Sequence, residues 1–473
     1  MTRRTVFAFL FAASLPVASL YAAPARESQS DPRLSKAFRR PEVSGWIFVH
    51  LEGTPSEIGF QHGYLLAPEI EDTQKVIKLG LTHDGHKSYS FFRTAAEKVL
   101  WPRVEPQYRD ELKGIADGLK ARGVPLDLWD VVVMNGSMEL SPYYTNWYDK
   151  QHQLSSVRRP VPEHCSAFVA VGSYTRDGKV VIAHNNWTDY TDGSRWNIIF
   201  DIVPSEGYRL LMDGMPGLIH SGDDYGVNSA GLAITETTIG SFVGFDPKGI
   251  PEFERARKAM QYAANIDDFA RIMKDGDNGG YANTWLVADT RNNEIASLEL
   301  GLKHVTLQRT KDGYFIGSNF PANPELIRDE TPDFPVSDLS ISANARRVRW
   351  EQLMQENKGK IDVAAAQRFL ADHYDTFLHE TAPSERTLCG HVDLSPRGYR
   401  AWQPAYGPAG TVQNKAADTT MLAQMSFTAA MGHADGIDFK AAQHLKEHPE
   451  FDWQKSVLRD LDSHAWTTFR TAQ

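Results

Sequence analysis

The chain has little cysteine, no concentrated positive charge and no long apolar run beyond its start. Only two of its 473 residues are cysteines, Cys165 and Cys389, which excludes a small disulfide-rich scaffold. Acidic and basic residues are intermixed and the net charge is −10, so we expect no nucleic-acid partner. No apolar stretch beyond residue 25 reaches the roughly 18 residues that cross a bilayer, and we expect no transmembrane span.

Several familiar catalytic motifs are also missing. There is no Gly-x-Ser-x-Gly, no P-loop and no Rossmann glycine triplet, which argues against the common serine hydrolases, NTPases and dinucleotide enzymes. His444, Glu447 and His448 match the inverted zinc motif His-x-x-Glu-His, but Pro449 ends that helix at once. We therefore expect no metal and no other cofactor.

The first 25 residues have the three parts of a secretory signal peptide. They combine a basic start at Arg3 and Arg4, an apolar run over 6–20, and small residues up to Ala25. We expect this segment to be removed and the mature protein to be exported, either to the periplasm or out of the cell. The sequence indicates no particular oligomeric state.

After the first 25 residues, the pattern predicts a mainly helical part followed by a part rich in strands. Residues 46–139 are expected to be mainly helical, with a helix start at Thr54 and an amphipathic helix over 107–122 that ends before Gly123. Residues 126–135 fit a short helix or a buried strand, and 141–163 an exposed connection. Strands are expected at 197–203, 231–239, 283–289, 295–300 and 314–319. Further helices are expected at 252–274, 344–355 and 363–373.

A strand-like alternation begins directly after Cys165 and is the centre of the chain. Apolar residues on both sides of Asp177 and Gly178 predict two paired antiparallel strands. If Arg176 pairs with Lys179 across a two-residue turn, Cys165 faces Tyr190. The polar residues after position 183 then lie within a few positions of the cysteine along the sheet.

An ordered series of segments is more specific than any one motif. It comprises His164-Cys165-Ser166-Ala167-Phe168, His184-Asn185-Asn186-Trp187-Thr188-Asp189-Tyr190, Ser221-Gly222-Asp223-Asp224-Tyr225, Glu236-Thr237-Thr238 and Gly279-Gly280-Tyr281-Ala282-Asn283-Thr284-Trp285. In this order the series resembles the phospholipase B-like (laminin ancestor) family. Ile58-Gly59-Phe60-Gln61-His62-Gly63 is similar to the related acyltransferase and peptidase group that includes isopenicillin N acyltransferase.

The resemblance implies an N-terminal nucleophile hydrolase with an α+β fold, a four-layer αββα sandwich. Such a protein is made as an inactive precursor that cuts itself before the nucleophile. The bond to be cut here lies between His164 and Cys165. Residues 26–164 would then form a helical fragment that stays packed on residues 165–473, the αββα core with a helical C-terminal part.

A cysteine at a new chain terminus has the chemistry that such a hydrolase needs. It carries a soft nucleophile and an α-amino group whose reference pKa of about 7.7 to 8.0 lets it accept the thiol proton. Asn283 is the first choice for an oxyanion donor, a role that can lower a barrier by about 2.7 to 4 kcal/mol. It also fits a plain turn residue at the end of a strand.

The other candidate residues have equally open roles. His184 is expected either to orient the amino group as a catalytic residue or to be a hydrogen-bonded, partly buried histidine. Trp187 falls where some relatives carry an aspartate that binds the terminal amine, so another group here would have to make that contact. The candidate substrate-binding residues are Asn185, Trp187, Asp223, Glu236, Thr237 and Asn319.

The sequence therefore predicts an exported, self-processing, cysteine-type hydrolase that cleaves a linear amide or an acyl ester. Its substrate would be a small acyl amide or a lipid. Acyl transfer to an amine is the nearest alternative, because the same acyl-enzyme can be intercepted by another nucleophile. A different class of protein also fits: an uncleaved, non-catalytic extracytoplasmic binding protein in which Cys165 and Cys389 form a disulfide.

Overall fold

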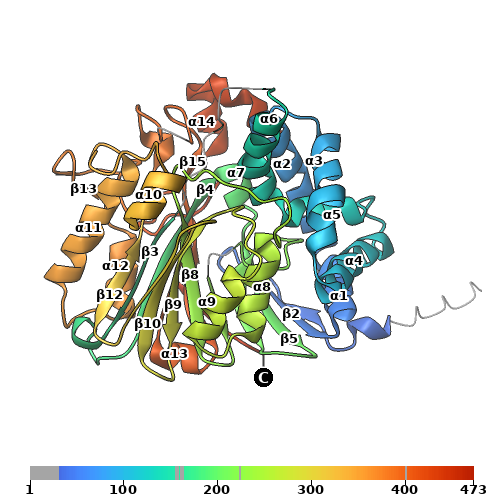
Figure 1. Cartoon of the computed structure of the whole chain (residues 1–473), viewed down its shortest axis with the longest axis horizontal. Coiled ribbons are helices and arrows are strands. Elements are labelled where there is room, and N and C mark those ends of the chain that lie inside the picture. The colour runs from blue at the N-terminus through green and yellow to red at the C-terminus, as the bar shows by residue number, and fades with distance from the viewer. Residues whose placement is uncertain (1–30, 155–158, 160–164, 223–224, 400–401, 473) are drawn as a thin grey trace, which may run out of the picture.

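The computed structural model describes residues 31–154, 159, 165–222, 225–399 and 402–472. Two large sheets lie face to face, and helices cover the outer face of each (Figure 1). This is the predicted four-layer αββα sandwich. The predicted signal peptide lies outside the described residues.

The first sheet has nine strands in the order β1-β2-β5-β6-β7-β8-β9-β10-β11. Their bounds are β1 Phe38–Arg39, β2 Ile47–Gly53, β5 Ile198–Pro204, β6 Leu210–Gly214, β7 Tyr225–Asn228, β8 Leu232–Thr238, β9 Asn283–Asp289, β10 Glu294–Leu300 and β11 Val305–Thr310. Strands β2 and β5 are parallel, and the other neighbours are antiparallel.

The second sheet has six strands in the order β12-β3-β4-β15-β16-β17, all antiparallel. Their bounds are β12 Gly313–Gly317, β3 Ser166–Val171, β4 Val181–Asp189, β15 Ala409–Asp418, β16 Ser426–Met431 and β17 Thr467–Arg470. A separate pair is formed by β13 Tyr374–Asp375 and β14 Glu380–Thr381.

The helices form the two outer layers and a few connections. On the first sheet lie α1 Pro55–Leu65, α2 Ala67–Gly85, α3 Tyr89–Ala95, α4 Pro106–Ala121, α5 Leu128–Asn135, α8 Glu252–Tyr262 and α9 Ile266–Lys274. On the second lie α11 Ser342–Glu356 and α12 Val363–Leu370. The rest are α6 Thr145–Gln151, α7 Tyr190–Gly193, α10 Pro324–Glu330, α13 Thr419–Ala423 and α14 Ala441–Glu447.

The alternation of side chains along each strand divides the buried apolar residues among four separate clusters. In β3, Ala167 and Val169 point between the sheets, whereas Phe168 and Ala170 point outward to Trp350 of α11. Up to Trp187, β4 follows the same alternation: its even-numbered residues point between the sheets, and its odd-numbered residues point outward. This assignment decides which candidate residues can share a site with the cysteine.

Several predicted elements are confirmed. The helix predicted from Thr54 is α1, and the Thr54 hydroxyl and the Glu57 carboxylate cap it reciprocally. The helix predicted over 107–122 is α4, and Gly123 follows it with a φ of 78°. Residues 126–135 contain a helix, α5, and the strand predicted over 283–289 is β9.

Other predictions are wrong at particular points. The region 46–139 also contains strand β2, and the connection predicted over 141–163 contains α6. The single helix predicted over 252–274 is two helices, because the side chain of Asn265 caps a new start. Strands β15, β16 and β17 belong to the second sheet, although the C-terminal part was expected to be helical.

The predicted register of the central hairpin is also wrong. Ala170 pairs with Val181, and Ser166 pairs with Asn185. A 3₁₀ turn over Gly172–Tyr174 lengthens the connection beyond a two-residue turn. Cys165 therefore lies beside Asn186 and not beside Tyr190.

None of the helices in the described part of the chain combines the length and the apolar composition of a membrane span.

One buried ion pair joins the two sheets directly. The ammonium of Lys415 in β15 lies 3.0 Å from Asp213 Oδ2 in β6, and both side chains are fully buried. Burial raises the pKa of Asp213, and the charge of Lys415 opposes that shift. If either side chain were removed, the charge of the other would stay buried without an opposite charge beside it.

We predict that Lys415→Met lowers the free energy of unfolding by about 3 to 5 kcal/mol, because Asp213 stays buried without its partner. Replacing both residues with apolar ones should recover most of that loss. Denaturant titration measures both effects, with Lys36→Met as the control, since Lys36 makes an exposed pair with Glu52. Equal midpoints for the two single variants would contradict this role of the pair.

Candidate active site

Cys165 directly precedes β3 and is 1% exposed. Its φ is 81°, in the left-handed region that non-glycine residues rarely adopt. The thiol donates to Asn186 Oδ1 over 4.0 Å, on the side of β4 that faces the other sheet. The backbone thus turns sharply at the cysteine and aims its sulfur between the two sheets. The peptide bond from His164 lies outside the described residues.

Arg346 of α11 holds the backbone at the cysteine from the outer layer. Its guanidinium is fully buried and donates to the carbonyl oxygen of Cys165 and, over 2.9 Å, to Ser166 Oγ. It also donates to Asn319 Oδ1 over 2.8 Å and to the Tyr399 hydroxyl over 3.1 Å. One cation therefore fixes the position of the strand start relative to α11 and to the segments of Asn319 and Tyr399.

The candidate residues of β4 divide between its two faces. His184 and Asn186 face the first sheet, and His184 pairs across the strands with Lys415. Asn185 points outward and donates to two backbone carbonyls of the outer layer. Trp187 also points outward, with the guanidinium of Arg346 4.3 Å from its ring centroid. The structure does not bring Asn185 and Trp187 to the thiol side of the sheet.

His184 is a neutral group near pH 7. Complete burial lowers its pKa well below the ordinary value, and the nearby charge of Lys415 lowers it further. A hydrogen bond with the backbone of Glu236 acts in the opposite direction but is the smallest of the three effects. The imidazole therefore contributes packing and hydrogen bonding between the sheets, without a charge.

Asn319 links the Arg346 contact at Cys165 to β8, the strand that pairs with the start of β9 at Asn283. Asn283 begins β9 and pairs with Thr238 of β8, whose carbonyl accepts from Asn319 Nδ2 over 2.9 Å. Asn319 in turn accepts from Arg346. The amide of Asn283 is buried, and neither of its polar atoms has a hydrogen-bond partner among the described residues. Buried amides are usually satisfied, so this one is available to a ligand.

Of the remaining candidates, two lie on β8 and one lies outside the described residues. Glu236 Oε1 accepts from the Tyr281 hydroxyl over 3.2 Å, on the helical side of the first sheet. Thr237 points the other way, and its side chain lies against Gly317, the residue that pairs with Ala167. Asp223 lies outside the described residues.

A cavity of about 580 Å³ lies beside the C-terminal end of β4. Asn186, the partner of the thiol, and Tyr281, the partner of Glu236, both line it. Its apolar walls combine aliphatic side chains, such as Val76, Leu81 and Leu218, with the aromatic rings of Trp196, Trp402, Phe451 and Trp453. A volume of this size is typical of sites for small ligands.

Sequence reasoning missed three residues of this arrangement. Asn186 and Tyr281 stood inside the quoted segments but were given no role, and Arg346 stood inside a predicted helix. A single arginine in a helical pattern carries no signal of burial. Its contact with Cys165 spans 181 positions and follows only from the packing of α11 on the second sheet.

The two cysteines are separate free thiols, and both are buried. Cys389 lies beside His391, whereas Cys165 lies beside Asn186. The disulfide that the binding-protein alternative requires is therefore not formed.

Comparison with known proteins agrees with the resemblance found in the sequence. Human phospholipase B-like 1 is 21% identical over 419 residues, which cover 79% of this chain and 74% of that protein. Phospholipase B of Crotalus adamanteus is 24% identical, covering 57% and 51%. A protein of Archaeoglobus fulgidus is 26% identical, covering 53% and 42%. The matches thus span about half the length of the last two relatives.

Among solved structures, a variant of conjugated bile acid hydrolase from Clostridium perfringens aligns with 65% of this chain and 97% of that chain. Its TM-score is 0.34 and its identity 11%, too low to support any argument. The model of the phospholipase B family, by contrast, matches residues 86–468, most of the sequence. This chain belongs to the phospholipase B family.

Proposed function

We propose that this protein is a cysteine-type N-terminal nucleophile hydrolase that cleaves a linear amide or an acyl ester. The observation that carries the proposal is the buried thiol of Cys165 at the start of β3, directed at Asn186, which lines the cavity. Cleavage before Cys165 would create the amino terminus that the chemistry needs. Export is part of the proposal and rests on the pattern of the first 25 residues.

The reaction needs only groups of this chain and water. The α-amino group of Cys165 takes the thiol proton, and the thiolate attacks the substrate carbonyl carbon. The leaving amine or alcohol departs with that proton, which leaves a thioester on the sulfur. Water then attacks the thioester, returns a proton to the thiolate and releases a carboxylic acid.

Asn283 is the proposed oxyanion donor. Its buried amide has no hydrogen-bond partner among the described residues, so it can donate to the charged oxygen without breaking another contact. Arg346 is a positioning residue, because its guanidinium holds the backbone carbonyl of Cys165 at the start of β3.

The cavity favours a substrate with an apolar acyl group. Its apolar walls are made of both aliphatic and aromatic side chains, and its volume of about 580 Å³ suits a chain of several carbons with a small head group. The Crotalus relative is named phospholipase B and the human relative phospholipase B-like 1, names that point to ester-linked acyl groups. The proposed chemistry suits amides equally well, so both classes belong in the first substrate screen.

We predict that Asn283→Ala lowers kcat by about 10² to 10³ while the unfolding midpoint stays close to wild type. The loss is catalytic because the amide of Asn283 contributes no hydrogen bond to the described fold. Hydrolysis of an N-acyl amide and of a lysophospholipid is measured beside thermal unfolding. Asn185→Ala is the matched control, because its amide bonds the outer layer and its loss should reduce stability first. Unchanged kcat in Asn283→Ala would remove the oxyanion role.

We predict that kcat/KM rises with pH through about 7.7 to 8.0, where the α-amino group of Cys165 loses its proton. His184→Gln should leave that acid limb in place, because burial already lowers the pKa of His184 and keeps the ring neutral. Rate profiles from pH 5 to 9 for both proteins make the comparison. If the limb disappears in His184→Gln, the histidine and not the terminal amine is the proton acceptor.

A further inference from the structure

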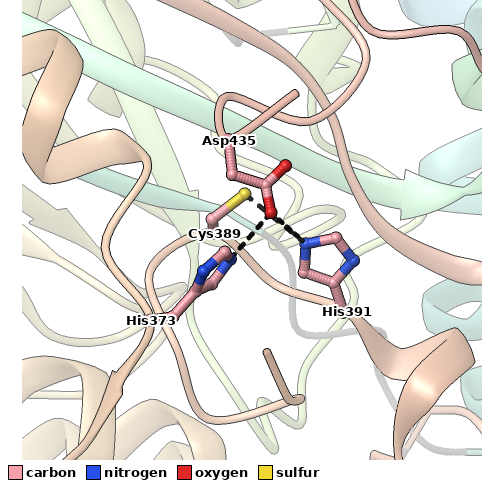
Figure 2. A group of neighbouring side chains, drawn as sticks. All are labelled: His373, Cys389, His391 and Asp435. Carbon is pink, nitrogen blue, oxygen red and sulfur yellow. Dashed lines mark hydrogen bonds and ion pairs between the residues drawn. The ribbon is translucent and has the colours of Figure 1, made fainter. Parts of the chain in front are cut away.

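Four metal-ligating side chains meet on the outer side of the second sheet, away from the thiol of Cys165. They are His373, Cys389, His391 and Asp435. His373 follows α12, the next two lie between β14 and β15, and Asp435 follows β16. Their potential ligand atoms all lie within 4.8 Å of one another, and Figure 2 shows the side chains converging.

The distances fit a tetrahedral centre. Asp435 Oδ2 lies 3.1 Å from His373 Nε2 and 3.2 Å from His391 Nε2. Cys389 Sγ lies 3.8 Å from His391 Nε2. Zinc bonds of about 2.0 to 2.1 Å to nitrogen and oxygen and about 2.3 Å to sulfur would separate tetrahedral ligands by about 3.3 to 3.6 Å. Small side-chain movements therefore suffice to close the four groups on one ion.

The donor set selects the kind of metal. Two imidazoles, one thiolate and one carboxylate suit Zn²⁺ and similar transition-metal ions. Calcium and magnesium prefer oxygen ligands throughout, so Cys389 and the histidines argue against them. His433 lies close by but is already engaged, because its two ring nitrogens contact Tyr190 and the carbonyl of Ile437.

The surroundings hold these ligands in place. Asp435 Oδ1 accepts from the backbone of Ile437 over 2.8 Å, which leaves Oδ2 directed at the cluster. Asp393 Oδ1 lies 3.8 Å from His391 Nδ1 and accepts from the Tyr190 hydroxyl over 2.7 Å. A carboxylate behind a histidine is the usual support of a metal-bound imidazole. Cys389 and His391 are fully buried, whereas His373 and Asp435 are slightly exposed and leave a path for the ion.

We propose that His373, Cys389, His391 and Asp435 bind one Zn²⁺-type cation with a structural role. Four protein ligands complete a tetrahedral shell, so no position remains for a substrate. The sequence predicted no metal, and its one zinc-like pattern, at His444, Glu447 and His448, lies elsewhere in the chain. The inference goes beyond the proposed function and does not depend on it.

A metal at this site would stabilise the loop around Leu388 and Gly390, which packs against the outer side of β4. Leu388, next to the cysteine ligand, accepts a hydrogen bond from Asn185 of β4. Gly390 lies against the ring of Trp187, and the guanidinium of Arg346 stacks on that ring. A cation at the cluster would fix this loop and thereby the outer side of the strand beside Cys165.

The test is metal analysis of the purified full chain by mass spectrometry after dialysis against buffered Zn²⁺. We expect about one zinc per chain, and near zero in Cys389→Ser and in Asp435→Asn. His444→Ala is the matched control and should retain the metal, because it removes the histidine of the zinc-like sequence pattern only. A metal content that survives in Cys389→Ser, or that is lost in His444→Ala, would overturn the assignment.

Two readouts keep the test valid if one variant folds poorly. Co²⁺ bound to the wild-type chain should show a sulfur-to-cobalt charge-transfer band that Cys389→Ser lacks and Cys165→Ser retains. Chelation should lower the thermal unfolding midpoint of the wild type by about 5 °C or more. A folded wild-type chain with no stoichiometric metal, no such band and no response to chelator would refute the site. Neither readout uses activity, so failure of the proposed hydrolase leaves the result interpretable.

Discussion

The buried guanidinium of Arg346 is the interaction on which the arrangement around Cys165 depends. Removing a cation from water costs several kcal/mol unless its donors are satisfied. Here the acceptors are neutral oxygens of Cys165, Ser166, Asn319 and Tyr399, together with Ser342 Oγ. These acceptors lie at the start of β3, after β12, at Tyr399 and within α11 itself, so the cation is satisfied only when all of these segments are in place.

The hydrogen bonds of Arg346 link the outer helical layer to the inner face of the second sheet. The guanidinium approaches from α11 and holds the backbone carbonyl of Cys165, while the sulfur turns to Asn186 on the other face. Asn319 extends the contact to β8, where Asn283 lies opposite Thr238. The proposed nucleophile and the proposed oxyanion donor thus belong to different sheets, and the loop after β12 connects them.

Local patterns predicted local structure well. The helix start at Thr54 and the strand β9 could be predicted because each depends on residues only a few positions apart. The ordered motifs identified the αββα fold and placed Cys165 at a strand start. The hairpin register was missed because a 3₁₀ turn over Gly172–Tyr174 replaced the expected tight turn, and no short-range signal distinguished the two.

The parts that could not be predicted depend on distant contacts. Strand β15 pairs with β4 across more than 200 positions, and Arg346 reaches Cys165 across 181. Asn185 and Trp187 were candidates because they stand in a motif that resembles the family, yet alternation sends both side chains to the opposite face. The cluster around Cys389 is likewise assembled from three separate loops, so its residues look unremarkable when taken singly.

The central claim is that Cys165 becomes the first residue of a processed chain and acts as its nucleophile. Intact mass spectrometry with N-terminal sequencing of the purified protein, beside Cys165→Ala, tests it most directly. The account predicts two associated fragments in the wild type, one beginning at Cys165, and a single uncut chain in the variant. A single uncut chain in both would contradict the account, as would the same cut in both.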